Sequence, residues 1–518
     1  MSVAHENSVP TSDASVAQDK PGHWFWRVVV LSLSLLGLVI GLPGARFMYI
    51  WHRGKVEVAR ALEETDKLYP NWRWDDLVAQ REPLDPSEDA WPIVVELARR
   101  FRTHPRASEF SRSRPGSFWD WYHEEALKHP NRSLPPHLLE SINHWQADDP
   151  TLVQCAFQLL QYRRARIPLS PMQPDPYMVS LGMYDIPRGT MNALQLLHEG
   201  FCSEKRFREA EAMLLAQWVV GTCCDDELYA LGQIAGLGLE GRAVRRIERH
   251  LALGKLSQET RTRLAQILEQ RANRNPFLIM VRAERAAIQV AYDSLSSGRL
   301  TWRQFAQPIV HSVSSPIRPA GWSETWKKWV LEDLPHATKQ RFAYPYYLKF
   351  HAANLRYLNQ VEAFARLPFS DQAFPENQKT LKLPPEALEP FWAAVLCRGG
   401  PMQLDYPQLW SGCANLRGEL LAARAALAAE EYRVRHGRLP ADWSELVPTF
   451  LSEIPIDPFT GSAMLLKSTP EGIVIYSVGM NRTDEGGQVH DRKDVGFRLY
   501  HLPQRNAPPH PAKPASSP

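Results

Sequence analysis

The chain is poor in cysteine, poor in glycine and nearly balanced in charge. Six cysteines among 518 residues exclude a small disulfide scaffold, and 28 glycines exclude a collagen-like chain. Lys and Arg together number 60 and Asp and Glu number 57, which leaves a net charge of only +3. A chain without a strong basic field is not expected to bind nucleic acid.

Common catalytic motifs are missing as well. The sequence contains no Walker loop, no Gly-x-Ser-x-Gly and no Cys-x-x-Cys. His123 and Glu124 match the first two residues of the His-Glu-x-x-His motif of zinc proteases, but Leu127 occupies the position of the second histidine ligand. Residues 236–241 match Gly-x-Gly-x-x-Gly, yet a helical pattern precedes them instead of a strand, which favours helix packing over dinucleotide binding. We therefore expect no recognisable catalytic machinery.

One long apolar run is present near the N-terminus. Residues 28–42 carry no charge, and residues 24–45 would span about 33 Å as a helix, enough to cross a bilayer core of about 30 Å. We predict a disordered tail over 1–22 and a single transmembrane helix over 23–46, so that the lipid bilayer is one partner. A cleaved signal peptide and a buried core helix are the alternatives.

The remainder of the chain has a helical pattern with many proline breaks. The sequence holds 42 prolines, and residues 47–190 are interrupted by them repeatedly, with 167–187 predicted to be non-helical. Residues 191–411 carry successive apolar stripes, clearest over 190–296, that favour an irregular, solenoid-like α-helical body. The fold class is therefore mainly α, with a transmembrane helix before this body.

The pattern changes near the C-terminus. A long helix is predicted over 416–434 and should stop at Gly437, because glycine readily adopts the left-handed conformation that ends helices. Alternating apolar residues then predict strands near 464–466, 473–476 and 495–500. We expect a small α+β domain over 412–502 with an antiparallel sheet, followed by a disordered Pro-rich tail over 503–518.

A series of short motifs lies within residues 416–500. In order, they are His436-Gly437-Arg438-Leu439-Pro440, Ile454-Pro455-Ile456-Asp457-Pro458-Phe459-Thr460-Gly461, Ile475-Tyr476-Ser477-Val478-Gly479 and Asp484-Glu485-Gly486-Gly487. This series resembles the globular domain of the major pseudopilin of type II secretion systems. It is also similar to the C-terminal region of large membrane-anchored bacterial proteins that have a helical middle.

The resemblance implies a calcium site in the last loop. In the pseudopilin this loop binds calcium through aspartate side chains and backbone carbonyls, and the matching residues here are Asp484, Asp491 and Asp494, with Glu485 beside them. Oxygen ligands in a flexible loop suit Ca²⁺. The alternative is a solvated polar loop that glycines close.

The resemblance has a clear boundary at the N-terminus. A pseudopilin carries a glutamate five residues into its mature helix, and the residues around His23 contain none. Assembly of a fibre through packed N-terminal helices is therefore not implied.

Together these features predict a membrane-anchored scaffold or interaction protein of the cell envelope, with other envelope proteins as partners. A count of basic residues around the apolar run would place the body in the cytoplasm. The resemblance implies the outer side of the inner membrane, which we expect. An envelope hydrolase acting on cell-wall glycan or peptide and a component of a secretion apparatus remain alternatives. We expect the cysteines to be buried thiols, with Cys397 and Cys413 as the first pair to test for a disulfide.

Overall fold

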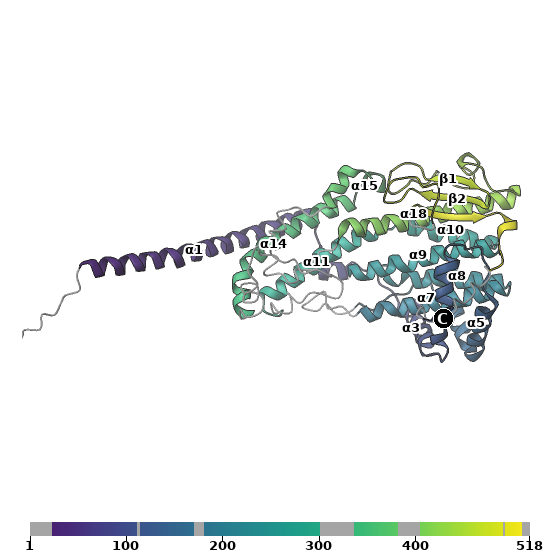
Figure 1. Ribbon diagram of the computed structural model, residues 1–518, viewed down its shortest axis with the longest axis horizontal. Helices are drawn as coiled ribbons and strands as arrows, with labels where there is room; N and C mark the ends of the chain where they lie inside the picture. Colours follow the sequence, from purple (N-terminus) through teal and green to yellow (C-terminus); the bar gives the residue numbers. More distant parts are fainter. Residues whose placement is uncertain are drawn as a thin grey trace, which may run out of the picture.

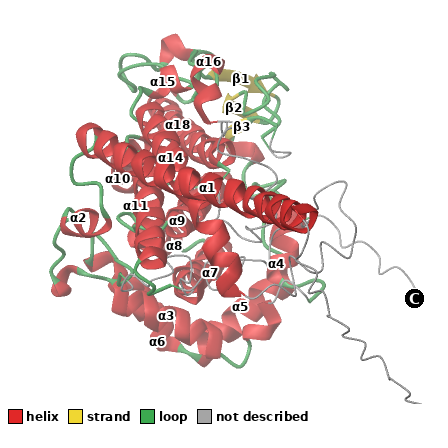
Figure 2. Cartoon of the chain, turned by 90° about the vertical axis from the view of Figure 1, so that its left-hand side faces the viewer, coloured by secondary structure: helices red, strands yellow, loops and turns green. Residues whose placement is uncertain are grey.

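The computed structural model describes residues 23–110, 114–169, 181–300, 336–381, 405–489 and 493–509. Most of these residues are helical, and a small antiparallel sheet lies near the C-terminus (Figures 1 and 2). The helices are α1 (His23–Leu68), α2 (Trp74–Ala79), α3 (Trp91–Thr103), α4 (Phe118–Trp121), α5 (Pro136–Asp148), α6 (Pro150–Gln158), α7 (Asp185–Ser203), α8 (Phe207–Gly221), α9 (Ala230–Leu253), α10 (Gln258–Ala272), α11 (Pro276–Ser296), α14 (His336–Ala365), α15 (Phe369–Gln372), α16 (Pro375–Gln378) and α18 (Tyr406–His436). The strands are β1 (Leu465–Thr469), β2 (Gly472–Ser477) and β3 (Val495–Tyr500).

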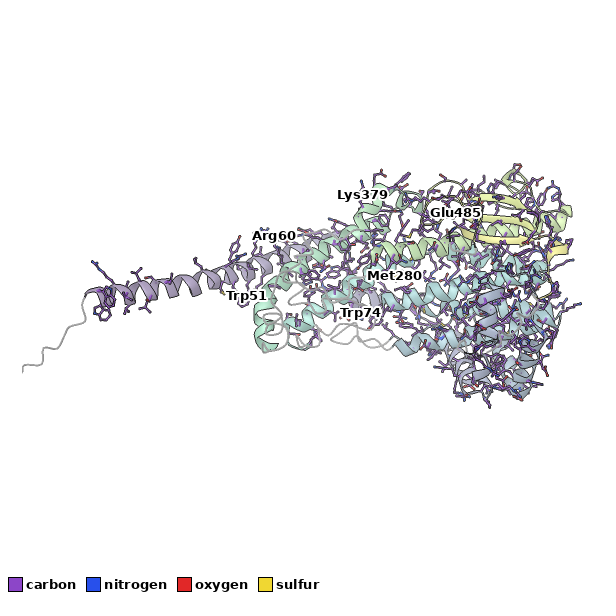
Figure 3. The ribbon with its side chains drawn as sticks, in the orientation of Figure 1. Trp51, Arg60, Trp74, Met280, Lys379 and Glu485 are labelled. Carbon is purple, nitrogen blue, oxygen red and sulfur yellow. The ribbon has the colours of Figure 1, made fainter. Side chains whose placement is uncertain are left out.

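Helix α1 is continuous over 46 residues and includes both the predicted membrane segment and the stretch that follows it. Its first half projects away from the other described elements, and Trp51 lies close to where it leaves the body (Figures 1 and 3). Within the residues that the structure describes, none of the helices combines the length and apolar composition needed to cross a membrane. The side chains of residues 23, 25, 36, 38–40 and 43, which belong to the predicted segment, lie outside the described part.

The second half of α1 packs along α14. Ala61 of α1 and Ala352 and Leu355 of α14 are buried in one apolar cluster with Trp72. Small alanine side chains allow two helix backbones to approach closely, so this pairing fixes the direction in which the first half of α1 projects.

Helices α7, α8 and α9 pack side by side and form the centre of the body (Figure 1). Nearly the whole length of α7 is buried, as expected for a helix with neighbours on all sides. The prediction of a non-helical stretch up to residue 187 was wrong at its end, because α7 begins at Asp185 and includes Pro187. Proline is tolerated in a first helical turn, where its missing N–H would have no helical acceptor.

The C-terminal region confirms the predicted helix stop and strands. The N–H of Gly437 donates the last helical hydrogen bond of α18, to the Arg433 carbonyl at 2.9 Å. The left-handed backbone of Gly437, with φ +75°, then ends the helix. The sheet has the order β1-β2-β3, and Ile475 of the central strand pairs with Leu466 and with Phe497. All six residues of β2 are buried.

The sheet and the helical body share one core. A single cluster of buried apolar side chains includes Leu97 of α3, Leu197 of α7, Leu251 of α9, Leu427 of α18 and Ile475 of β2. Helix α18 lies between α9 and α10 on one side and β2 and β3 on the other (Figure 2). Helix α18 therefore joins the two parts, and α9 also contacts β3 directly.

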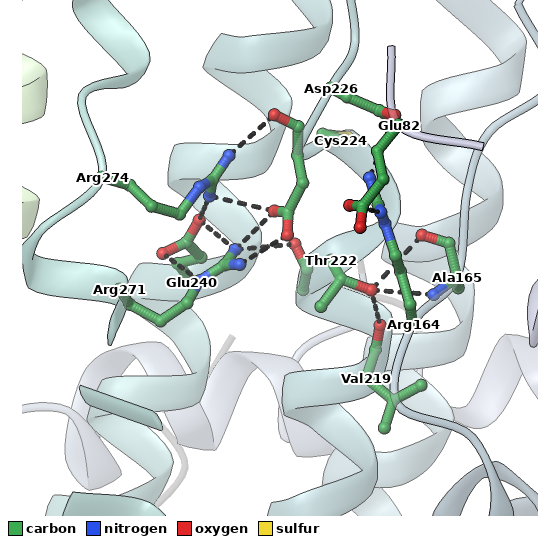
Figure 4. Close-up of polar contacts among 12 residues, drawn as sticks. Glu82, Arg164, Ala165, Val219, Thr222, Cys224, Asp226, Glu240, Arg271 and Arg274 are labelled. Carbon is green, nitrogen blue, oxygen red and sulfur yellow. Dashed lines mark hydrogen bonds and ion pairs between the residues drawn. The ribbon is translucent and has the colours of Figure 1, made fainter. Parts of the chain in front are cut away.

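Buried ion pairs connect the helices of the body (Figure 4). Arg271 at the end of α10 donates to Glu240 of α9 at 3.1 and 2.6 Å, and to Asp225 at 2.6 and 2.7 Å. Arg274 Nη1 lies 2.9 Å from both carboxylates. Glu240 belongs to the Gly-x-Gly-x-x-Gly motif, which the structure places inside α9. Gly241 of this motif faces α18, where an added Cβ would lie 3.2 Å from Glu419 Oε2.

The cysteines that the structure describes are thiols. These are Cys155, which is half-buried, and the buried Cys202, Cys223, Cys224 and Cys413. Cys397 lies outside the described residues, so its pairing with Cys413 stays a prediction.

Candidate functional site

Helices α7 and α9 bring two histidines and one cysteine together in the core of the body. His198 and Cys202 are four residues apart on α7, so both point to the same side of that helix. His250 lies near the end of α9, which crosses α7 at this level. The relative exposure is 0% for both histidines and 5% for Cys202, so the cluster is closed to solvent.

The three side chains approach one another through their nitrogen and sulfur atoms. His198 Nε2 lies 3.1 Å from His250 Nδ1. Cys202 Sγ lies 3.6 Å from His198 Nε2 and 3.8 Å from His250 Nδ1. One ligand atom from each residue therefore faces a common point.

The protonation of the cluster follows from its neighbours. His250 Nε2 lies 3.2 Å from the Lys255 carbonyl oxygen, which can only accept, so Nε2 carries the proton and Nδ1 presents its lone pair. Burial lowers the pKa of His250 to about 4 and holds the pKa of His198 well below its usual value, with the Arg246 charge acting in the same direction. Burial raises the pKa of the Cys202 thiol. Near neutral pH the cluster is thus two neutral imidazoles and a thiol.

Two buried carboxylates lie near this cluster, and both accept hydrogen bonds from other groups. Glu199, next to His198 in sequence, binds Arg246 at 2.5 Å and Arg249 at 2.8 Å. Glu211 accepts from the Ser257 N–H and hydroxyl at 2.6 and 2.5 Å, and from the Thr260 hydroxyl at 2.6 Å. These contacts fix α9 and the start of α10 against α7 and α8, and so hold the cluster in place.

Two imidazole nitrogens and a sulfur form a ligand set that suits transition metals such as zinc and copper. In the part of the chain that the structure describes, these three residues are the one group of His, Cys, Asp and Glu whose ligand atoms lie close enough together, within 4.8 Å, to hold a metal ion.

Two of the predicted calcium residues, Asp484 and Asp494, lie between β2 and β3 in the described part of the chain. Asp484 is exposed, and its Oδ1 accepts from the Tyr476 hydroxyl at 2.9 Å and from the Gly486 N–H at 2.7 Å. Glu485 accepts from the Asn481 side chain. Asp491 lies outside the described residues, so the calcium set as a whole stays a prediction.

Asp494 is buried, and it organises the same loop. Its carboxylate accepts backbone N–H groups from Gly487 at 2.8 Å, from Gln488 at 2.9 Å and from Glu485 at 3.4 Å. Burial raises the pKa of Asp494, and these bonds oppose that effect. Both oxygens accept backbone N–H groups, so Asp494 stabilises the loop.

Sequence reasoning missed the histidine–cysteine cluster. The pair on α7 was visible as one helix face, because His198 and Cys202 are one turn apart. Its partner follows 48 residues after Cys202 in another helix, and nothing in the spacing marks it. Only the crossing of α7 and α9 identifies His250.

No family model matches the chain, and neither a curated protein nor a solved structure matches it. The similarity to pseudopilins therefore stays a prediction.

Proposed function

We propose that the protein is a membrane-tethered scaffold of the cell envelope, in which the first half of α1 inserts into a lipid bilayer and carries the helical body on its other end. The observation that supports this proposal is the half of α1 that projects from the body (Figure 1). Its described apolar side chains are largely exposed.

The exposed apolar side chains lie on all sides of this half-helix. The relative exposures of Val30, Leu31, Leu33 and Leu35 are 57%, 69%, 62% and 65%. Because each residue of a helix turns by about 100°, Val30, Leu31 and Leu33 point in three different directions. A protein groove would cover one stripe of a helix, whereas lipid covers the whole circumference.

The energy of leaving these side chains in water favours the same conclusion. Each valine or leucine side chain gains about 1.5–3 kcal/mol on full transfer out of water. The run of residues 28–42 contains no charge that would oppose this transfer. A bilayer is the partner that removes all of these side chains from water at once.

The second half of α1 transmits this anchorage to the body. Arg356 of α14 donates to Glu57 at 3.0 Å and to Glu64 at 2.8 Å, and the Asn359 side chain donates to Thr65 Oγ1 at 2.8 Å. Together with the apolar contacts between α1 and α14, these bonds fix the second half of α1 to the body. Because α1 is one continuous helix, the tether is a helix and not a flexible linker. Such a tether holds a body at a set distance from the membrane, which suits a scaffold.

The proposal is tested by fractionation of cells that express the full chain. We expect the wild-type protein in the membrane pellet after alkaline carbonate extraction. The double change Leu33→Arg and Leu35→Arg should release it, because an arginine at the centre of a bilayer costs about 2.5–3.5 kcal/mol. The matched control is Leu68→Arg, which alters an exposed leucine at the body end of the same helix and should leave the protein in the pellet. Wild-type protein in the carbonate supernatant at full length would contradict the tether.

Orientation and partners need two further measurements. A reporter fused to the C-terminus should show that the body lies on the outer side of the inner membrane. Crosslinking in intact cells followed by purification of the full chain should return the same envelope proteins in repeated experiments, and the absence of any reproducible partner would contradict the scaffold role.

A further inference from the structure

We propose that His198, Cys202 and His250 bind one zinc ion through Nε2, Sγ and Nδ1, and that this ion ties α7 to α9. This site is independent of the membrane tether, because it lies in the body and uses none of the residues of α1.

The distances within the cluster match the edges of a zinc coordination tetrahedron. With Zn–N bonds of about 2.0–2.1 Å and a Zn–S bond of about 2.3 Å, a tetrahedral ion separates two nitrogens by about 3.3 Å and a nitrogen and a sulfur by about 3.6 Å. The observed separations are 3.1 Å between the nitrogens and 3.6 and 3.8 Å from sulfur to nitrogen. The side chains therefore need to move by only a few tenths of an ångström to receive the ion.

The surroundings of His250 are those of a metal ligand. A ligating histidine usually donates its second ring N–H to a carbonyl or a carboxylate, which fixes the tautomer and the ring plane. His250 meets this requirement through the Lys255 carbonyl. The ring of Phe207 packs edge-on against His250 at a centroid separation of 5.9 Å and restricts it further.

The charge balance also permits an ion here. Three arginines near the cluster are paired with carboxylates, because Arg246 and Arg249 bind Glu199 and Arg505 binds Glu430, and Glu211 contributes a further negative charge nearby. On binding, Cys202 loses its proton to solvent and coordinates as a thiolate, while His198 coordinates through Nε2 with its proton on Nδ1. The net reaction is Zn²⁺ plus one thiol giving one zinc thiolate and one proton.

The role that this geometry supports is structural. Three protein ligands leave one coordination position, as in catalytic zinc sites, but the residues around it are fully buried. A substrate in solution does not reach ligands that are buried in this way. The ion would thus act as a crosslink between helices that are adjacent in the core.

The test uses the full chain, purified in detergent, stripped with a chelator and then loaded with Zn²⁺ or with Co²⁺ as a spectroscopic probe. We expect one zinc per chain by elemental analysis and a Co²⁺–thiolate charge-transfer band. Cys202→Ser and His250→Asn should weaken zinc binding at least a hundredfold and abolish the band. The matched control is Cys224→Ser, which alters another buried cysteine outside the cluster and should keep one zinc per chain.

Two outcomes would overturn the proposal. One is a wild-type chain that binds no zinc and shows no thiolate band, and the other is a Cys202→Ser chain that binds zinc as the wild type does. Should the variants fail to fold, the wild type alone decides the question. Its melting temperature should rise with added Zn²⁺ and fall back with chelator. An unchanged melting temperature in saturating Zn²⁺ would refute the site, even where the membrane tether is confirmed.

Discussion

Replacing Glu240 by glutamine should loosen the centre of the helical body. Glu240 is buried in α9, and it accepts three bonds from Arg271 and Arg274 at 3.1, 2.6 and 2.9 Å (Figure 4). The glutamine has nearly the same shape, so the change removes one negative charge and leaves the packing in place. Asp225 then faces both guanidinium groups alone.

The expected cost follows from burial and from what remains. A buried ion pair that loses one partner destabilises a fold by about 3–5 kcal/mol. We expect the lower end, about 3 kcal/mol, because Asp225 still neutralises one arginine and 23% of the Arg274 side chain is exposed. The matched control is Glu269→Gln. Glu269 lies on α10 and binds Arg424 of α18 at 3.1 Å, but its side chain is 54% exposed, so the change should cost less than about 1 kcal/mol.

Hydrogen exchange measured by mass spectrometry is the suitable assay, because it reports local opening in a chain too large for two-state unfolding. Amides of α9 and α10 should exchange about a hundredfold faster in the Glu240→Gln protein, as a loss of about 3 kcal/mol requires. Amides of α14 should not change. Equal exchange in the wild type, the variant and the control would refute the view that this buried network stabilises the body.

Three further predictions concern the C-terminal region. Burial alone would raise the pKa of Glu430, but bonds from Arg433 and Arg505 outweigh it and hold the pKa below its usual value. The stabilisation from Glu430 is therefore complete above the unfolded pKa of about 4.3 and is lost as the pH falls through the lower folded value. Glu430→Gln should melt earlier than wild type at pH 7, and the two melting curves should converge in acid. Gly437→Ala, at φ +75°, should destabilise the chain by about 1 kcal/mol in a melting experiment, and an unchanged stability would contradict the left-handed cap. Calcium should raise the melting temperature if the predicted loop site exists, and Asp494→Asn should abolish that rise; identical melting with calcium and with chelator would end the calcium prediction.

The parts of the fold that the sequence predicts are those that depend on local chemistry. The stop of α18 follows from glycine at residue 437, and strand β2 follows from the run at residues 473–476. The helices over 190–296 follow from apolar stripes with a helical period. In each case the residues that predict the element lie within it or next to it, so a single sequence is enough to predict the element.

What the sequence does not predict depends on contacts between distant residues. Arg245 of α9 meets Glu419 of α18 across 174 residues, and Arg498 of β3 binds Glu248 of α9 across 250 residues. Neither spacing carries a periodic signal. The packing of α18 between the body and the sheet was therefore not visible, and for the same reason His250 was not associated with the pair on α7.

The buried carboxylates explain how helices of similar composition find their correct neighbours. Glu199 binds arginines of α9, Glu240 binds arginines at the end of α10, Glu362 binds arginines of α11, and Glu430 binds Arg505 after the last strand. Apolar stripes can pack against one another in several registers at a similar energy, whereas a helix shifted by one turn would leave these charges buried without a partner. We infer that the ion pairs select the register and that the apolar core supplies most of the stability. The proposed zinc site follows the same principle, because α7 and α9 already share the ion pairs of Glu199 and present their three metal ligands only in the register that those pairs select.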